Sequence, residues 1–331
     1  MTIQRLLVVG SNGLLGQKVV ELFVRGSSAE ITASSVEPAP VRNLHSVAYR
    51  QTDITSKKDV RALVSAVEPG VIINCAAMTS VDACETEREL AWKINVSGVE
   101  HLADAAKRAN AALVHISTDY VFDGKHGPYS EDDRPEPLSY YGKTKLASEN
   151  ALRASDITYL ILRTMVLYGH AEGVKANFAL WLIESLQKKS PVKVVDDQIG
   201  NPTLVDDLAY AIMRAVELQK WGLYHIAGRD IMSRYDFAVR LAGVFGLDAG
   251  LITPIKTEDL RQPAPRPLQS GLVTLKAETE IGYRPSTVEE GLAIVKSQLS
   301  RNTRRPVGDR GPASAQSQQR PNEGRPGKRP S

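Results

Sequence analysis

Two side chains in the segment SYYGKTK have the types and spacing that proton transfer requires. Tyr141 and Lys145 stand four positions apart, so a helix would place both side chains on one face. A phenol titrates at about 10 and is a poor acid or base at neutral pH unless a nearby cation favours the phenolate. Lys145 can supply that charge. The rival pair, Tyr140 with Lys143, has the less favourable three-residue step, so we favour Tyr141 and Lys145.

A glycine-rich turn near the N-terminus predicts a site for a dinucleotide. Residues 3 to 9 form a short apolar run, and residues 13 to 25 repeat apolar side chains at helical spacing. The turn between them has the spacing G-x-x-G-x-x-G, and such a turn lets the backbone approach a pyrophosphate and present helix N–H groups to it. The cofactor residues predicted from this turn are Gly10, Asn12, Gly13, Leu14, Leu15 and Gly16.

The type of nicotinamide cofactor depends on the end of the second strand. Ser34 and Ser35 stand where an NAD-preferring protein usually carries an acidic side chain for the ribose hydroxyls, and serine tolerates a 2′-phosphate. Arg42 could add positive charge for that phosphate, whereas Glu37 could take the NAD role. We expect NADPH, with NADH as the alternative.

A second cofactor contact is predicted after the third strand. Asp53 could accept a hydrogen bond from the adenine amino group, and we include its neighbour Ile54 in this contact. A turn or a helix cap would use Asp53 equally well.

These residues need a parallel sheet to bring them together. Apolar runs of strand length alternate with helical patterns through residue 163, which predicts an α/β fold with a Rossmann-type, doubly wound parallel sheet. We place the NAD(P)-binding domain in residues 1–165, with about 190–228 returning to it. Residues 166–300 would form most of a smaller, discontinuous substrate-binding domain. One long helix is expected over about 86–108.

Composition narrows the class of protein further. Hydrophobic content of 42% and charged content of 24% are ordinary for a globular protein, and no apolar run reaches the roughly 18 residues of a membrane span. The start MTIQRLLVVG runs into a strand pattern, so we expect a cytoplasmic protein without a membrane partner. The two cysteines predict neither a disulfide framework nor a metal site.

The C-terminal tail differs from the rest of the chain. Residues 301–331 are rich in Arg, Pro, Gly, Ser and Gln and nearly lack apolar side chains, so we predict a disordered basic tail. No aromatic residues are interleaved for stacking on bases, which argues against a nucleic-acid partner. A homodimer is left open.

One strand end adds a hydroxyl to the phenol and the ammonium. Thr118, in HISTDYVFDG, would lie at the carboxyl end of a strand, which is where ligands bind in an open α/β sheet. A resemblance that covers about residues 3 to 298 then rests on seven segments: VGSNGLLG, NCAAMTSVDACE, KINVSG, STDYVFDG, YGKTK, DQIGNPT and RPLQSGL. With them the chain resembles the extended short-chain dehydrogenase/reductases and, within these, the dTDP-4-dehydrorhamnose reductase family.

The resemblance implies an NAD(P)H-dependent reduction. The C4 ketone of a nucleotide-linked 4-keto-6-deoxy sugar would accept a hydride while Tyr141 protonates the developing alkoxide. Lys145 would hold the nicotinamide ribose and lower the pKa of the phenol, and Thr118 would hydrogen-bond the reacting oxygen.

The resemblance also implies contacts along both ligands, with plain packing as the alternative for each residue. Asn95 matches a position that supports the lysine through water, and Arg266 could bind the substrate diphosphate or be an ordinary surface arginine. The implied cofactor contacts are Cys75, Ala76, Ala77, Thr79, Asn95, Ser117, Tyr141 and Lys145. The implied substrate contacts are Thr79, Val81, Thr118, Asp119, Tyr120, Val166 and Arg266.

Related reactions and one related protein class are the alternatives. Tyr120 stands where the 4,6-dehydratases place an acidic residue, and no second acid/base for epimerisation is evident. Met165 and Val166 replace the family's Ser-Trp, so the aromatic wall for the sugar is missing and another keto sugar could be the substrate. The regulatory β subunit of methionine adenosyltransferase, which binds NADP without catalysis, also lacks that tryptophan. The intact set of Thr118, Tyr141 and Lys145 favours the enzyme.

Overall fold

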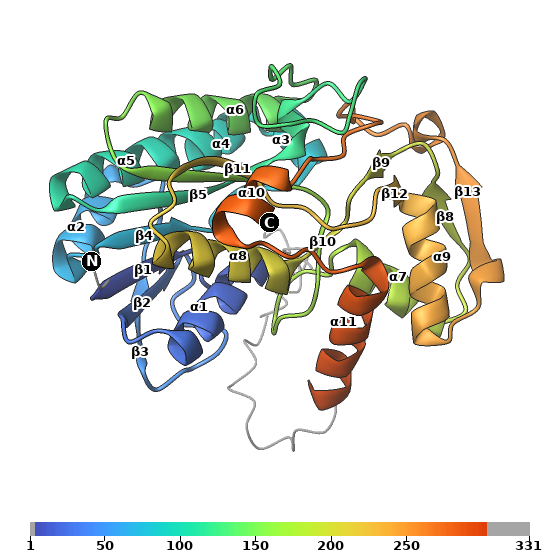
Figure 1. Ribbon diagram of the computed structural model, residues 1–331, viewed down its shortest axis with the longest axis horizontal. Coiled ribbons are helices and arrows are strands. Elements are labelled where there is room, and N and C mark those ends of the chain that lie inside the picture. Colours follow the sequence, from blue (N-terminus) through green and yellow to red (C-terminus); the bar gives the residue numbers. More distant parts are fainter. Residues whose placement is uncertain (1–3, 303–331) are drawn as a thin grey trace, which may run out of the picture.

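The computed structural model describes residues 4–302, and a seven-stranded parallel sheet forms its centre (Figure 1). The strands stand in the order β11-β6-β5-β4-β1-β2-β3. Their bounds are β1 Arg5–Val9, β2 Glu30–Ser35, β3 Val47–Gln51, β4 Val71–Asn74, β5 Ala112–Thr118, β6 Tyr159–Thr164 and β11 Gly222–His225. The chain reverses direction across the sheet between β1 and β4, which confirms the Rossmann-type doubly wound fold.

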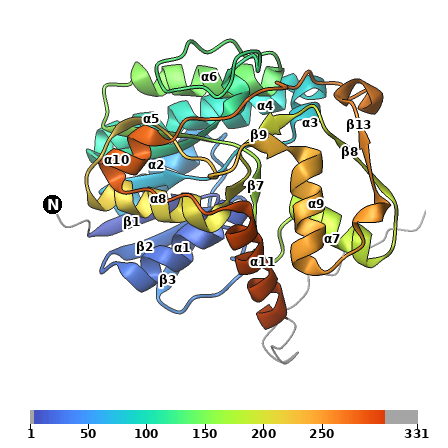
Figure 2. The ribbon, with the colours of Figure 1, turned by 45° about the vertical axis from the view of Figure 1, so that its right-hand side comes forward.

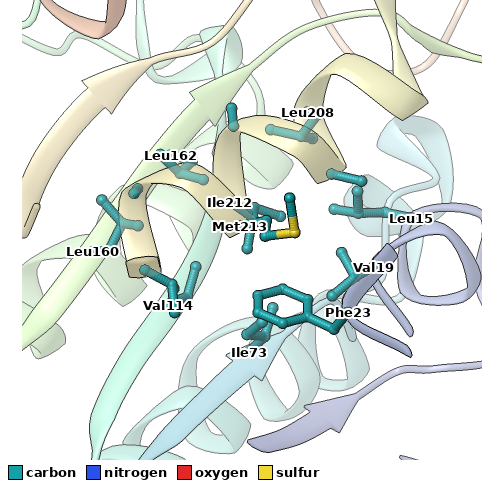
Figure 3. Packing of buried hydrophobic residues seen from close by; sticks show 14 of the residues in the cluster. Leu15, Val19, Phe23, Ile73, Val114, Leu160, Leu162, Leu208, Ile212 and Met213 are labelled. Carbon is teal, nitrogen blue, oxygen red and sulfur yellow. The ribbon is translucent and has the colours of Figure 1, made fainter. Parts of the chain in front are cut away.

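Helices cover both faces of this sheet. One face carries α1 (Leu14–Gly26), α8 (Val205–Glu217) and α10 (Leu275–Ile281), and the other carries α2 (Lys57–Val67), α5 (Gly98–Ala109) and α6 (Tyr140–Arg153) (Figure 1). The alternation of side chains along β1 explains this arrangement. Leu6 and Val8 pack with α1 and α8, whereas Leu7 and Val9 pack with α2 and α5. Figure 3 shows the first of these cores, where Phe23 of α1 and Met213 of α8 lie over the strands.

A smaller lobe stands at one end of the sheet (Figure 2). It has a separate core that α7, α9 and α11 share with the parallel pair β8 and β13. The bounds are α7 Phe178–Gln187, β8 Val192–Val195, α9 Arg234–Phe245, β13 Ile252–Ile255 and α11 Val288–Asn302. Two short pairs lie between lobe and sheet, β7 (Leu167–Tyr168) with β10 (Thr203–Leu204) and β9 (Ile199–Gly200) with β12 (Met232–Ser233). We predicted that residues from about 190 to 228 return to the NAD(P)-binding domain. Because β8 pairs with β13 in the smaller lobe, the chain rejoins the main sheet only with α8 and β11. The division into domains stays a proposal.

The long helix expected over about 86–108 is present as a continuous helical run from Arg88 to Ala109, which contains a π-helical turn. The run consists of α4 (Arg88–Trp92), the π-helical turn η1 (Lys93–Ser97) and α5, whereas Thr86 ends a separate helix, α3 (Val81–Thr86). Glu87 leaves helical geometry between α3 and α4, with φ −115° and ψ 54°. A periodic apolar pattern continues through such a break, so the pattern alone could not reveal it. Short 3₁₀ turns, η2 (Asp119–Val121), η3 (Ala249–Leu251) and η4 (Thr257–Leu260), complete the elements.

Three findings concern the predictions made from composition about membrane spans, cysteines and the C-terminal tail. No helix in residues 4–302 is long and apolar enough to cross a membrane. Both cysteines, Cys75 and Cys84, are free thiols. Our prediction of a disordered tail falls on residues 301–331, of which 303–331 lie outside the described residues; Arg301 and Asn302 end α11.

Candidate active site

The turn between β1 and α1 accepts only glycine at two positions. Gly10 has φ +76°, in the left-handed region, and a Cβ there would lie 2.5 Å from the backbone nitrogen of Ala76. A Cβ on Gly16 would lie 2.2 Å from the carbonyl oxygen of Gly10. Helix α1 starts after Gly13 without a side-chain cap and without an acidic residue in its first turn. Its first N–H groups are therefore available to an anion.

Two buried hydroxyls beside this turn also point to a ligand. Ser11 Oγ and Ser34 Oγ are buried without a hydrogen-bond partner among the described residues, and the two residues are joined by a backbone hydrogen bond of 3.0 Å. An unpaired buried hydroxyl is costly, and a ribose or phosphate oxygen would satisfy it. The turn therefore fits the pyrophosphate and ribose of NAD(P)H.

We expect Gly16→Ala to weaken NADPH binding and to lower the free energy of unfolding by about 1–3 kcal/mol, because the methyl group has no space beside Gly10. Urea denaturation and titration of NADPH fluorescence would measure the two effects. Gly243→Ala is the matched control: Gly243 is an exposed residue of α9 whose Cβ would meet no atom within 4 Å. That substitution should stabilise the protein by about 0.5–1 kcal/mol. Wild-type NADPH affinity in Gly16→Ala would contradict this account of the turn.

The two charged residues weighed for cofactor preference both have protein partners. The Asn12 side-chain amide donates to Glu37 Oε2 at 3.1 Å, and Asn12 N donates to Ser35 Oγ at 3.3 Å. Arg42 forms a salt bridge with Glu21. Neither Glu37 nor Arg42 is thus a ready contact for the ribose, and the preference for NADPH continues to rest on the serines that end β2.

The residues after β3 already have partners within the protein. Asp53 is exposed, and its Oδ1 accepts a hydrogen bond of 2.8 Å from Thr55 N, which is the turn role that the sequence left open. Ile54 is buried against Gly98, where a Cβ would lie 2.7 Å from Ile54 Cδ1. The adenine contact of Asp53 and Ile54 stays a prediction.

Asn95 joins the loop after β4 to helix α6. Its Oδ1 accepts from Met78 N at 2.8 Å, and its Nδ2 donates to Met78 O at 3.0 Å and to Thr144 Oγ1 at 3.1 Å. The loop itself contains Cys75, Ala76, Ala77 and Thr79, of which Thr79 is exposed and the others are half-buried. Burial raises the pKa of the Cys75 thiol to about 12, so this thiol is neutral. Asn95 therefore fixes the backbone of the loop relative to the helix that carries Tyr141.

The predicted hydroxyl, phenol and ammonium come from two adjacent elements. Helix α6 begins after Ser139, whose Oγ accepts from Gly142 N at 3.2 Å, and it carries Tyr141 and Lys145 on one buried face. Thr118 ends β5, and its hydroxyl lies close enough to Tyr141 to lower the pKa of the phenol in part. At Gly142 a Cβ would lie only 2.1 Å from Tyr120 O, so the first turn of α6 packs directly on the segment after β5. The structure thus brings the three predicted catalytic residues together.

Lys145 has a partner that the sequence did not predict. Its Nζ lies 3.1 Å from His115 Nε2, and the same ring nitrogen lies 3.0 Å from Ser148 Oγ. Burial lowers the pKa of Lys145 to about 8, although Glu149 opposes this effect. Burial and the charge of Lys145 hold the pKa of His115 well below its usual range, so this imidazole is neutral.

The pKa of Tyr141 differs from what the resemblance implies. Burial raises the pKa of its phenol above the ordinary value, the hydrogen bond with Thr118 lowers it in part, and Asp119 raises it further. Packing of the chain alone therefore acts against the lowering expected from Lys145. A raised pKa keeps Tyr141 protonated at neutral pH, which is the state that a proton donor needs.

A buried ion pair joins helix α6, which carries Tyr141 and Lys145, to strand β6. Glu149 of α6 accepts from Arg163 of β6 at 2.9 Å and 2.8 Å, and Ser117 Oγ of β5 donates to Glu149 Oε1 at 2.5 Å. Glu149 and Arg163 are 0% and 1% exposed. Ser117 is thus joined to α6, and the cofactor contact predicted for it stays a prediction.

On the substrate side, the loop after β5 meets the C-terminal part of the chain. Ser270 Oγ donates to Asp119 Oδ2 at 2.5 Å, and Thr118 Oγ1 donates to Asp119 Oδ1 at 3.0 Å. The rings of Tyr120 and Tyr141 meet edge to face at 5.6 Å, and Val81 packs against the same cluster. Asp119, Tyr120, Val166 and Ser270 line one cavity. Three of the predicted substrate residues, Asp119, Tyr120 and Val166, therefore line a common cavity, and Tyr120 connects it to Tyr141.

Two of the predicted substrate residues have unexpected surroundings. The Arg266 guanidinium donates to both carboxylate oxygens of Asp82 at 2.6 Å and 2.7 Å, so its bidentate face is occupied by the protein itself. Val166 lies in the cavity wall with φ +45°. A β-branched residue rarely adopts such a left-handed backbone, and strain of this kind gathers at functional sites.

We expect Asp119→Asn to remove a pH dependence of stability. Burial raises the pKa of Asp119 from 3.8 to about 6, while the hydrogen bond from Ser270 lowers it in part. Between these values the folded state holds a proton that the unfolded state has lost, so the free energy of unfolding falls as pH rises from about 4 to 6, by an amount on the order of 3 kcal/mol. Urea denaturation of both proteins at pH 4 and pH 7 tests this. A wild-type difference that persists in Asp119→Asn would refute it.

Several site residues escaped prediction from the sequence. Arg234, Asp82 and Ser270 lie far along the chain from the residues that they approach. Asp82 and Ser270 fall within two of the quoted segments, but their side chains were given no role there. His115 did carry a signal, because it stands two residues before Ser117 on the same face of β5, which points to the helix carrying Lys145.

Comparisons with known proteins agree with this geometry. The family model described as RmlD substrate binding domain matches residues 4–300. The chain belongs to this family. The dTDP-4-dehydrorhamnose reductase of Aggregatibacter actinomycetemcomitans is 36% identical over 294 residues, which is 85% of this chain and 95% of that protein. Another protein of similar sequence is the methionine adenosyltransferase 2 subunit beta of Xenopus laevis, 33% identical over 83% of this chain and 82% of that protein.

Solved structures of the RmlD family have the same fold. A dTDP-4-dehydrorhamnose reductase from Clostridium acetobutylicum has a TM-score of 0.81 at 36% identity, covering 90% of this chain and 100% of that one. The Bacillus anthracis dTDP-4-dehydrorhamnose reductase, solved in complex with NADP, has a TM-score of 0.77 at 30% identity, covering 89% and 99%. The family resemblance inferred from the seven segments is thereby confirmed.

Proposed function

We propose that this chain is an NAD(P)H-dependent oxidoreductase that reduces the C4 ketone of a nucleotide-linked 4-keto-6-deoxy sugar, as a dTDP-4-dehydrorhamnose reductase. The observation that carries the proposal is the meeting of Thr118, Tyr141 and Lys145 at the end of β5, beside a turn that fits a dinucleotide. The named reductases of similar sequence and fold support the same reaction.

Tyr141, Thr118 and Lys145 have different roles in the proposed reaction. The bound nicotinamide supplies the hydride. Tyr141, protonated at neutral pH, gives its proton to the oxygen that becomes the alcohol, and Thr118 orients that oxygen by a hydrogen bond. Lys145, on the same face of α6, would supply the positive charge that favours the remaining phenolate; His115 contacts the lysine and the charge of Glu149 favours its protonated form. Arg234 of the smaller lobe and Ser270, which is hydrogen-bonded to Asp119, line the cavity on the substrate side.

The test follows the absorbance of NADPH with purified protein and enzymatically generated dTDP-4-keto-6-deoxy-L-sugar. Oxidation that depends on the sugar supports the reductase. Parallel assays with NADH and with the corresponding UDP sugar would establish the preferred cofactor and carrier base. NADPH binding without oxidation of any of these sugars would overturn the proposal.

The non-catalytic alternative is not favoured. The chain is similar to the β subunit of methionine adenosyltransferase, but a regulator has no need for a buried phenol beside a threonine hydroxyl with a buried ammonium on the same helix face. The cytoplasmic location and the homodimer stay predictions, which subcellular fractionation and analytical ultracentrifugation would test.

A further inference from the structure

Arg234 occupies a position that the activity described so far does not use. It is the first residue of α9, and its guanidinium lies 5.3 Å from the centre of the Phe178 ring. The cap of this helix is already satisfied, because Ser233 Oγ accepts from Asp236 N at 3.0 Å and Asp236 accepts from Ser233 in return. The Arg234 side chain lines the cavity that also contains Asp119, Tyr120 and Val166. The helix end is therefore capped by its own residues, and Arg234 brings a positive charge to the wall of this cavity.

The charge of Arg234 has no carboxylate at close range. Within residues 4–302, no carboxylate approaches the guanidinium to salt-bridge distance; Tyr120 and Asp119 attract it and Arg266 repels it from farther away. The aromatic face of Phe178 compensates only part of the cost of removing a cation from water. Arg266, the arginine that the sequence indicated for the diphosphate, has the opposite environment, since Asp82 holds it through two hydrogen bonds. Of these two arginines, Arg234 is the one with positive charge to offer a ligand.

We propose that Arg234 binds the diphosphate of the nucleotide-sugar substrate. The inference rests on the proposed function, and it assigns the anion subsite to the smaller lobe. The order of groups in the structure matches the order of groups in such a substrate. Tyr141 and Thr118 stand where the C4 oxygen reacts, Tyr120 lies next to Tyr141 with its ring 5.6 Å away, and Arg234 lines the same cavity as Tyr120. The diphosphate is attached at C1, across the sugar ring from C4, and so it would lie on the Arg234 side.

The experiment measures binding directly, without turnover. Isothermal titration calorimetry with dTDP, UDP, GDP and thymidine would be done on the wild type, Arg234→Met and Arg234→Lys. We expect Arg234→Met to lose about ten- to hundredfold in affinity for the nucleoside diphosphate that binds best, with thymidine binding unchanged. Arg234→Lys should recover part of the loss, because it restores the charge without the planar fork. Arg240→Met is the matched control on the same helix, since Arg240 pairs with Glu289 on the surface.

The outcomes separate this inference from the proposed reaction. If no sugar is reduced but Arg234→Met still loses diphosphate affinity selectively, the subsite stands and only the reaction fails. Unchanged diphosphate affinity in a folded Arg234→Met would overturn the subsite even in an active enzyme. Equal losses for thymidine and diphosphate, or a wild type that binds none of the nucleoside diphosphates, would overturn it too. If Arg234→Met does not fold, Arg234→Lys decides, because wild-type affinity there would exclude a bidentate contact.

Discussion

Tyr141→Phe should lower kcat by about 10²- to 10⁴-fold, the usual contribution of a positioned acid. The substitution removes one hydroxyl and keeps the ring that packs with Tyr120 and Cys84, so the fold should remain. Single-turnover oxidation of NADPH by the substrate would measure the loss, and circular dichroism would verify the structure. Affinity for NADPH should change much less than kcat.

Tyr140→Phe is the matched control for that experiment. Tyr140 is the adjacent residue on α6, but its ring faces Arg88 at 5.0 Å and its backbone nitrogen donates to Glu85 at 2.5 Å. Within residues 4–302 its hydroxyl forms no hydrogen bond with Thr118, so kcat should stay close to that of the wild type. Loss of activity in Tyr140→Phe with retention in Tyr141→Phe would show that the wrong tyrosine has been assigned.

The largest expected effect on stability comes from Glu149→Ala. The substitution leaves Arg163, which is 1% exposed, without its carboxylate, and it removes the acceptor of the Ser117 hydroxyl. Loss of one partner of a buried ion pair costs about 3–5 kcal/mol of unfolding free energy, because the remaining charge is buried without compensation. Urea denaturation would measure the change.

An exposed ion pair gives the comparison. Glu184 and Lys188 are one helical turn apart on α7, with side chains 60% and 66% exposed. Glu184→Ala should therefore cost less than about 1 kcal/mol. Similar losses in Glu149→Ala and Glu184→Ala would mean that burial does not set the strength of the Glu149 interaction.

Local patterns predicted the parts of the site that lie within one element. The four-residue step of Tyr141 and Lys145 became one face of α6, and the glycine spacing became a turn that no larger residue fits. Contacts between distant segments were not predictable in the same way. Ser270 meets Asp119 across 151 positions, and Arg266 meets Asp82 across 184. Such pairs depend on how distant segments of the chain pack against each other. Hydrophobic periodicity does not indicate which polar side chains become partners.

Burial explains the remaining differences. The sequence suggested that Lys145 would act on Tyr141 mainly through its charge. The folded chain buries both groups, which raises the pKa of Tyr141 and lowers the pKa of Lys145, so that burial favours the neutral form of each. The spacing of two side chains gives their proximity, but their exposure follows from elements such as η2 and α3, which pack over them. Electrostatic behaviour was thus less predictable than position.

The contacts of Asn95 depend on the number of residues in the π-helical turn Lys93–Ser97. A π turn contains one more residue than an α-helical turn, and Asn95 lies within it, facing Met78 on one side and Thr144 on the other. Deleting a single residue here would allow a continuous α-helix, but it would rotate the residues on either side by about 100° relative to one another. Loops at the rim of the protein can gain or lose residues freely. In this segment a deletion would displace Asn95 from both partners, so evolution can vary its side chains more easily than its number of residues.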